Sequence, residues 1–171
     1  MNTTNFKGNP VKLAGNVPAK GETAPDFTYV REDLSEKSLK DHGNGVKVII
    51  AVPSIDTGVC QAETRRFNKD LSNHDGVTGI VVSKDLPFAM KRFCAAEGIE
   101  SVEIASDFRG NFVSNYNTLM TDGPLKGLSA RVVFVLDGSN TIQHVEIVDD
   151  ITHEPDYSAA MKAVEGLLAS A

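Results

Sequence analysis

The chain of 171 residues has no tryptophan, only two cysteines and no apolar run long enough to cross a membrane. It also lacks any concentration of basic residues: 17 lysines and arginines stand against 23 acidic residues, and the formal net charge is −6. Nucleic acid is therefore an unexpected partner, because contact with phosphates requires a basic face. Residues 1–7 have no apolar segment of the kind found in secretory signals, so we expect a soluble protein of the reducing cytoplasm, without membrane contact.

The two cysteines, Cys60 and Cys94, are too far apart in the sequence to form the Cys-x-x-Cys motif of a thioredoxin-type dithiol. In a reducing compartment they are also not expected to form a permanent structural disulfide. The four histidines are scattered along the chain without metal-ligand spacing. We therefore expect no metal site, and the chemistry described below needs no haem, flavin or other cofactor.

Cys60 stands at a predicted junction between a strand and a helix. The apolar run 46–52 predicts a strand covered on both faces, and residues 61–71 predict the helix that follows. A cysteine at the start of a helix meets unpaired backbone N–H groups and the positive end of the helix dipole, which both favour thiolate over thiol. Since only the thiolate is a good nucleophile, Cys60 is the candidate reactive residue; the alternative is a buried structural cysteine.

The order of the predicted elements favours an α/β fold formed by a single domain over residues 1–171. Residues 46–82 predict a strand–helix–strand unit with parallel strands and a right-handed crossover. Residues 131–148 predict a β-hairpin, and residues 155–168 predict a terminal amphipathic helix. This is the layout of the thioredoxin-like fold, in which helices flank a central mixed sheet.

Three local predictions concern the connections. Residues 1–25 are expected to form an N-terminal extension with a short hairpin within 11–17. Asp85 is the expected N-cap of a helix that has Pro87 in its first turn and carries Cys94. The pair at 149–150, two aspartates, is expected to form a solvent-exposed turn rather than an acid/base pair.

Three further residues complete a candidate site around Cys60. Pro53 ends the predicted strand and can wall a pocket, and the hydroxyl of Thr57 can donate a hydrogen bond to the sulfur or to a bound oxygen. Arg131 is a charged residue at the start of a core strand, where it can supply a cation. A peroxide suits such a site, because Arg131 and Thr57 can stabilise the charge on the departing oxygen. Alternatively, Thr57 only caps the helix, and Arg131 forms a structural ion pair with Asp56 or another carboxylate.

Attack on a peroxide leaves a sulfenic acid on Cys60, which a second thiol can convert into a disulfide. Cys94 is the other thiol of the chain and hence the candidate resolving cysteine. It lies among Phe93, Ala95 and Ala96 in a predicted helix, so a core role is the alternative. A disulfide needs Cα atoms within about 7 Å, so if Cys94 is packed away its helix must unwind locally.

An ordered set of motifs resembles the bacterial thiol peroxidase subfamily of the peroxiredoxins. The set comprises Pro53-x-x-x-Thr57-x-x-Cys60 and the segments 6–10, 83–89, 92–94, 122–128 and 130–131. The resemblance implies a thioredoxin-like (peroxiredoxin) fold with an N-terminal hairpin. It implies Cys60 as peroxidatic nucleophile, Cys94 as its intramolecular disulfide partner, and Thr57 and Arg131 as activating residues. Reduction by thioredoxin, a homodimer and a preference for alkyl hydroperoxides are implied as well.

The expected function is therefore that of a thiol-specific peroxidase, which reduces hydrogen peroxide and organic hydroperoxides to water and alcohols in antioxidant defence. Two other functions stay open at this point. One is a redox sensor that uses the same cysteine pair as a switch without turnover. The other is a non-catalytic thioredoxin-like module without a reactive thiol.

Overall fold

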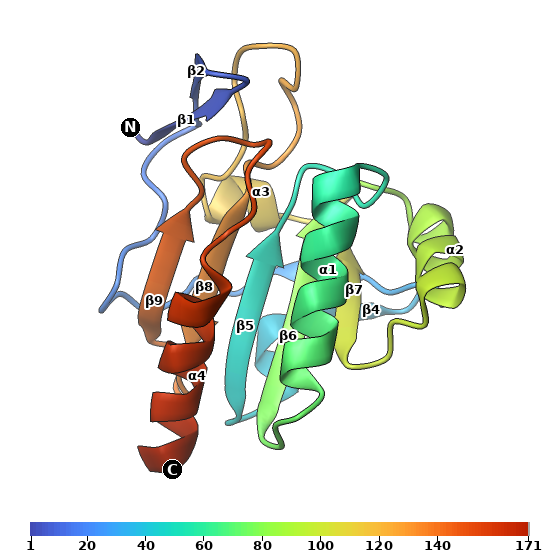
Figure 1. Ribbon diagram of the computed structural model, residues 1–171, viewed down its shortest axis with the longest axis vertical. Helices are drawn as coiled ribbons and strands as arrows, with labels where there is room; N and C mark the ends of the chain where they lie inside the picture. The colour runs from blue at the N-terminus through green and yellow to red at the C-terminus, as the bar shows by residue number, and fades with distance from the viewer. Residues whose placement is uncertain (171) are drawn as a thin grey trace.

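A seven-stranded mixed sheet forms the centre of the computed structural model, which describes residues 1–170 (Figure 1). In spatial order its strands are β4 (Glu36–Ser38), β3 (Thr28–Val30), β7 (Val102–Ser106), β6 (Val77–Ser83), β5 (Val46–Ala51), β8 (Val132–Leu136) and β9 (Ile142–Ile147). All six residues of β5 are buried, as the unbroken apolar run predicted. Strand β5, which lies between β6 and β8, thus provides a fully buried base for the loop that follows it.

Strands β5, β6 and β7 are parallel and are joined by helices α1 (Gly58–Leu71) and α2 (Pro87–Glu97). The predicted strand–helix–strand unit is confirmed. Strands β8 and β9 pair as the predicted antiparallel hairpin, and α4 (Tyr157–Ser170) is the predicted terminal helix. Within residues 1–170, no helix combines the length and the apolar character that crossing a membrane requires.

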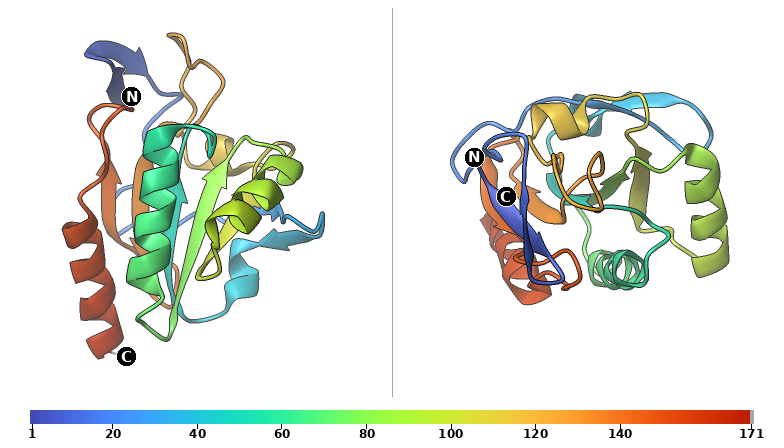
Figure 2. Two further views of the ribbon diagram at one scale, coloured as in Figure 1. Left: turned by 45° about the vertical axis from the view of Figure 1, so that its right-hand side comes forward. Right: turned by 90° about the horizontal axis from the view of Figure 1, so that it is seen from above.

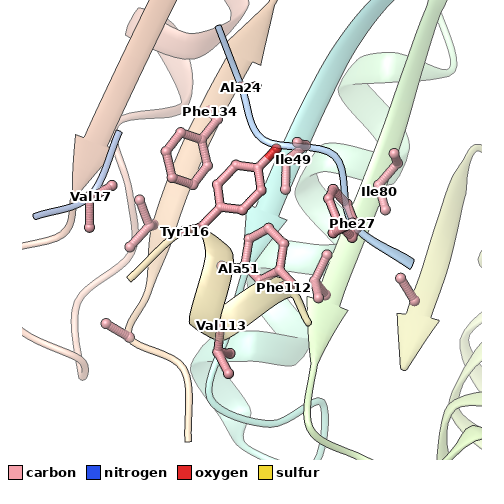
Figure 3. Packing of buried hydrophobic residues seen from close by; sticks show 14 of the residues in the cluster. Val17, Ala24, Phe27, Ile49, Ala51, Ile80, Phe112, Val113, Tyr116 and Phe134 are labelled. Carbon is pink, nitrogen blue, oxygen red and sulfur yellow. The ribbon is translucent and has the colours of Figure 1, made fainter. Parts of the chain in front are cut away.

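Different elements cover the two faces of the sheet (Figure 2). Helices α1, α2 and α4 lie on one face, whereas α3 (Phe112–Asn115) and the extended N-terminal segment lie on the other. On the α3 face the aromatic side chains pack closely (Figure 3). Phe112 stacks on Tyr116 with 4.4 Å between ring centroids, and Phe27 meets Phe112 edge-on at 4.9 Å. Each buried ring stabilises the fold by about 1.5–3 kcal/mol relative to an exposed one.

The N-terminal extension forms a hairpin, but not within residues 11–17 as expected. β1 (Thr3–Phe6) pairs with β2 (Asn9–Lys12) through the turn Lys7-Gly8. Both turn residues have positive φ, which two-residue hairpin turns require. The carboxylate of Asp150 accepts hydrogen bonds from both of their N–H groups, at 3.3 and 2.9 Å. Asp150 is 6% exposed, so the prediction of a solvent-exposed turn at 149–150 was wrong for this residue.

Helix α2 begins at Pro87, but the prediction that Asp85 caps it was wrong. Leu86 occupies the N-cap position, and no side chain caps the helix. Pro87 has no N–H group, which removes one of the donors that a cap would otherwise satisfy. The carboxylate of Asp85 is instead directed at the loop before α1, where it accepts hydrogen bonds from Ser54 and Ile55. The 3₁₀ helix η1 (Leu39–His42) completes the elements.

Candidate active site

The segments singled out in the sequence meet at one edge of the sheet, where the parallel strands β5, β6 and β7 end. Cys60 follows β5 after a short loop, at the end of α1 that is uppermost in Figure 1. Strand β8 is antiparallel to β5, with Val132 opposite Ala51, so β8 begins at this same edge. Arg131 directly precedes Val132 and therefore reaches Cys60, although 71 positions separate the two residues.

Cys60 has no exposed surface and is the third residue of α1. The N-cap of this helix is Thr57, whose Oγ1 accepts a hydrogen bond from the backbone N–H of Cys60 at 3.4 Å. The hydroxyl of Thr57 donates to the carbonyl oxygen of Ser54 at 3.2 Å. The alternative of a capping threonine is thus observed, and in this structure its proton is directed at Ser54 rather than at the sulfur. Pro53 is buried at the start of this loop, directly after the strand, as expected.

The guanidinium of Arg131 lies against the sulfur. Its Nη1 donates to Sγ of Cys60 at 3.2 Å and to Oε2 of Glu63 at 2.6 Å. Its Nε and Nη2 both donate to the carbonyl oxygen of Ile151, at 3.0 and 2.8 Å, which fixes the plane of the guanidinium. The N–H of Ile151 in turn donates to the carbonyl oxygen of Asn5 in β1, at 2.8 Å. The N-terminal hairpin therefore supports the peptide that orients Arg131.

Arg131 brings a positive charge to this buried position. Burial alone would lower the pKa of Arg131, but the negative charges of Cys60 and Glu63 outweigh it and raise the pKa above the ordinary arginine value. Arg131 is 1% exposed, so water screens its charge only weakly. The guanidinium of Arg131 is permanently protonated, and its Nη1 lies 3.2 Å from Sγ of Cys60. Together with the N-terminus of α1, it stabilises negative charge on this sulfur.

Glu63 is a site residue that the sequence analysis missed. It lies one helical turn after Cys60, has no exposed surface, and takes the place of the carboxylate partner that was considered at Asp56. Its Oε1 atom has no hydrogen-bond partner within residues 1–170. Burial raises the pKa of Glu63, and the opposing attraction of Arg131 does not cancel this effect. The only available signal was its position three residues after Cys60, on the same helix face.

Cys94 occupies a separate environment on α2. Both cysteines are free thiols in this structure, and Cys94 is half-buried. It lines a cavity of about 600 Å³ formed by α2, the β3–β4 hairpin and the first residues of β6 and β7. Glu32, from the connection between β3 and β4, lines the same cavity. Burial, and then the charge and hydrogen bonding of Glu32, raise the pKa of Cys94 to about 12, so Cys94 is protonated at neutral pH.

A partly exposed cluster of charged and polar side chains around Glu103 also lines this cavity. Glu103 accepts hydrogen bonds from the hydroxyl of Tyr29 and pairs with Arg31 at 2.7 Å and with His42 at 3.2 Å. Burial would raise the pKa of Glu103, but the hydrogen bonds from His42 and Tyr29 and the charge of Lys37 outweigh it and lower the pKa to about 2. The cluster joins β3, β7 and η1 and makes no contact with Cys60. Among residues 1–170, no three histidine, cysteine or acidic side chains converge as metal ligands would.

Comparison with known proteins shows the family of this chain. Residues 19–161 match the family model for redoxins. The chain belongs to the redoxin family. Its redoxin relatives include a thiol peroxidase of Leptospira interrogans, 52% identical over 171 residues, which cover 98% of this chain and 100% of the relative. A thiol peroxidase of Aquifex aeolicus is 44% identical over 166 residues, which cover 97% of this chain and 98% of the relative.

Solved structures support the same assignment for this redoxin. The crystal structure of a peroxiredoxin-like protein from Aquifex aeolicus matches with a TM-score of 0.93 and 44% identity, over 98% of each chain. A thiol peroxidase from Chromobacterium violaceum matches with a TM-score of 0.90 at 22% identity, over 99% of this chain and 98% of its own, which bears on the fold alone. The predicted thioredoxin-like fold and the resemblance to thiol peroxidases are confirmed.

Proposed function

We propose that this redoxin is a thiol-dependent peroxidase that reduces hydrogen peroxide and organic hydroperoxides to water and alcohols, in antioxidant defence. The 3.2 Å contact between Nη1 of Arg131 and the buried Sγ of Cys60 is the observation that carries the proposal. It unites a nucleophile and a cation that are distant in the sequence. The similarity over nearly the full length to proteins named thiol peroxidase supports the same reaction.

In the oxidation step, the thiolate of Cys60 attacks the terminal oxygen of the hydroperoxide. An S–O bond forms, the O–O bond breaks, and the second oxygen departs as an alkoxide or hydroxide that takes a proton from water. Cys60 becomes a sulfenic acid. The donors of Arg131 and the N-terminus of α1 stabilise the departing charge, and Thr57 adds a donor once its hydroxyl turns away from Ser54.

In the resolving step, Sγ of Cys94 attacks the sulfur of the sulfenic acid. The disulfide forms, and the hydroxyl leaves with the proton of the Cys94 thiol as water. Cys94 lines a cavity to which the fully buried Cys60 does not contribute, so the proposal includes local unwinding of α2 to deliver Cys94 to the sulfenic acid. With 11 residues, of which Pro87, Met90 and Phe93 are buried, α2 has a small apolar anchor to release.

The remaining parts of the proposal follow from the family resemblance. A thiol reductant returns the disulfide to two thiols, and thioredoxin is the reductant that the subfamily implies. The chain acts as a single domain over residues 1–171, as a homodimer and in the cytoplasm, without a metal, a cofactor or nucleic acid.

A coupled assay with thioredoxin, thioredoxin reductase and NADPH tests the function, with hydrogen peroxide and a bulky organic hydroperoxide compared side by side. Sustained NADPH consumption is the expected result. Consumption of one equivalent of peroxide without turnover would favour the redox sensor, and absence of any reaction would favour the non-catalytic module. Treatment with one equivalent of peroxide, followed by mass spectrometry, should show a bridge between Cys60 and Cys94. An intermolecular bridge or a lasting sulfenic acid would contradict the resolving role.

A further inference from the structure

Asp85 is fixed to the end of the sheet from several directions. Its Oδ1 accepts a hydrogen bond from the hydroxyl of Ser54 at 2.8 Å, and its Oδ2 accepts one from the N–H of Ile55 at 2.8 Å. The hydroxyl of Ser83 also donates to Oδ2. The hydroxyl of Ser106, the last residue of β7, donates to the carbonyl oxygen of Asp85. The side chain of Asp85 thereby joins the end of β6 to the loop before Cys60, while its backbone carbonyl is held by the end of β7.

A short series of hydrogen bonds continues from this loop to the reactive cysteine. The carbonyl oxygen of Ser54, whose hydroxyl is held by Asp85, accepts the hydroxyl of Thr57 at 3.2 Å. Oγ1 of Thr57 in turn accepts the N–H of Cys60 at 3.4 Å. Ile55 has no exposed surface and packs in the same hydrophobic cluster as Cys60. The position of Sγ relative to Arg131 thus depends on where Asp85 holds residues 54–55.

None of these bonds involves helix α2. Asp85 precedes the helix, and Leu86 occupies the N-cap position between them. The buried side chains that anchor α2 are those of Pro87, Met90 and Phe93. Unwinding of α2 from Pro87 onward therefore leaves the contacts of Asp85 with both the sheet and the loop in place.

We propose that Asp85 is a positioning residue for Cys60, which holds residues 54–57 and keeps the sulfur against Arg131 even when α2 opens to release Cys94. The proposal rests on the peroxidase function and on the roles assigned above to the two cysteines. Asp85 lies in the connection between β6 and α2, the helix that carries Cys94. Its proposed task nevertheless concerns Cys60.

The test is the second-order rate constant for oxidation of Cys60 by hydrogen peroxide, measured by rapid mixing. A displacement of the sulfur by about 1 Å costs roughly 100-fold in rate, so Asp85→Ala is expected to slow oxidation by about that factor. Asp85→Asn keeps an oxygen for the N–H of Ile55 and gains an NH₂ group that can donate to Ser54, so it should stay within about threefold of the wild-type rate. Rescue by the amide is a result that general destabilisation would not give.

The matched control is Asp137→Ala. Asp137 also collects several hydrogen bonds at a turn, since its Oδ1 accepts the N–H groups of Ser139 and Thr141 at 3.0 and 2.9 Å, but it lies at the opposite end of the sheet. Its loss should leave oxidation of Cys60 unchanged. The rate of disulfide formation from the sulfenic acid should also be similar in Asp85→Ala and in the wild type, because α2 opens independently.

Three results would overturn the proposal: oxidation of Asp85→Ala at the wild-type rate, an equal loss in Asp137→Ala, or a loss in Asp85→Asn as large as in the alanine variant. If Asp85→Ala does not fold, Ser54→Ala removes the hydrogen bond to Oδ1 of Asp85, together with the one that Oγ of Ser54 accepts from the N–H of Asp56. A loss of about tenfold in that variant supports the proposal, and an unchanged rate overturns it. A wild-type protein that does not react with peroxide would refute the peroxidase function instead, before Asp85 is tested.

Discussion

Cys60 and Cys94 carry the same thiol in opposite surroundings. Cys60 is fully buried at the start of α1, with a guanidinium nitrogen 3.2 Å from its sulfur. Cys94 lies in the second half of α2 beside a cavity, and the charge that acts on it is the carboxylate of Glu32. A nearby cation favours a thiolate and a nearby anion disfavours it. The surroundings of Cys60 therefore suit its proposed role as the nucleophile, whereas those of Cys94 keep its thiol protonated.

The two helices that carry these cysteines differ in the same sense. Helix α1 has 14 residues and buries five side chains, including Phe67 and Leu71, against the middle of the sheet. Helix α2 has 11 residues and buries three. Because local opening costs less where fewer side chains are buried, we propose that α2 opens while α1 stays folded. The comparison places the proposed reactive cysteine on the helix with more buried side chains and the proposed resolving cysteine on the helix with fewer.

The largest effect is expected from Cys60→Ser. A serine hydroxyl is not ionised at neutral pH, so peroxide consumption should fall by more than about 10⁴-fold. Cys94→Ser is the matched control, because it should form one equivalent of sulfenic acid at close to the wild-type rate and then stop. Equal losses in the two variants would remove the distinction between the cysteines.

The second largest effect is expected from Arg131→Lys. The guanidinium reaches Cys60, Glu63 and Ile151 at once, whereas a lysine has a single nitrogen and cannot reproduce this geometry. Loss of an aligned donor at the departing oxygen costs roughly 10²–10³-fold in the rate of Cys60 oxidation. Arg66→Lys, on the exposed face of α1, serves as the control and should be unchanged. A loss below about threefold in Arg131→Lys would exclude Arg131 from the mechanism.

Glu103→Gln should lower the stability of the protein, because Glu103 is the centre of the cluster of charged and polar side chains that lines the Cys94 cavity. The pKa of Glu103 is lowered from 4.5 to about 2, so its stabilising contribution is present above pH 4.5 and is lost as the pH falls through about 2. The variant should lose about 1–2 kcal/mol of unfolding free energy at pH 7, because solvent screens this partly exposed cluster, and less as the pH approaches 3. Urea unfolding at several pH values measures this difference. A difference that does not change with pH would contradict the assignment, as would slower oxidation of Cys60.

The smallest effect is expected from Glu32→Gln. It removes the negative charge beside Cys94 but leaves the burial of the thiol, so the pKa of Cys94 should fall only part of the way from about 12. Alkylation of Cys94 at pH 8.5 should become about three- to tenfold faster. Glu36→Gln is the control, because Glu36 lies on the same hairpin but pairs with Arg109. Equal alkylation rates in the two variants would show that the charge of Glu32 does not raise the pKa of Cys94.

What the sequence could predict depended on how local each interaction is. The role of Thr57 as a cap needs a partner only three positions further along the chain, and Arg131 was conspicuous as a charge at the start of an apolar strand. Glu63 looked like one more polar residue of a surface helix, since its burial depends on the antiparallel position of β8. Asp85 matched a local capping rule, but its actual partners lie 30 and 31 positions away. Such pairings become visible only when the strand order is known.

The link from the N-terminal hairpin to Arg131 matters for how this enzyme is prepared and assayed. The peptide of Ile151 donates to Asn5 on one side and accepts Arg131 on the other, while Asp150 binds the turn at residues 7–8. Trimming the first residues, or attaching an affinity tag that displaces β1, would loosen the support of the guanidinium far from the tag itself. A tag placed after α4 avoids this, so rates measured on amino-tagged and carboxyl-tagged preparations should not be pooled.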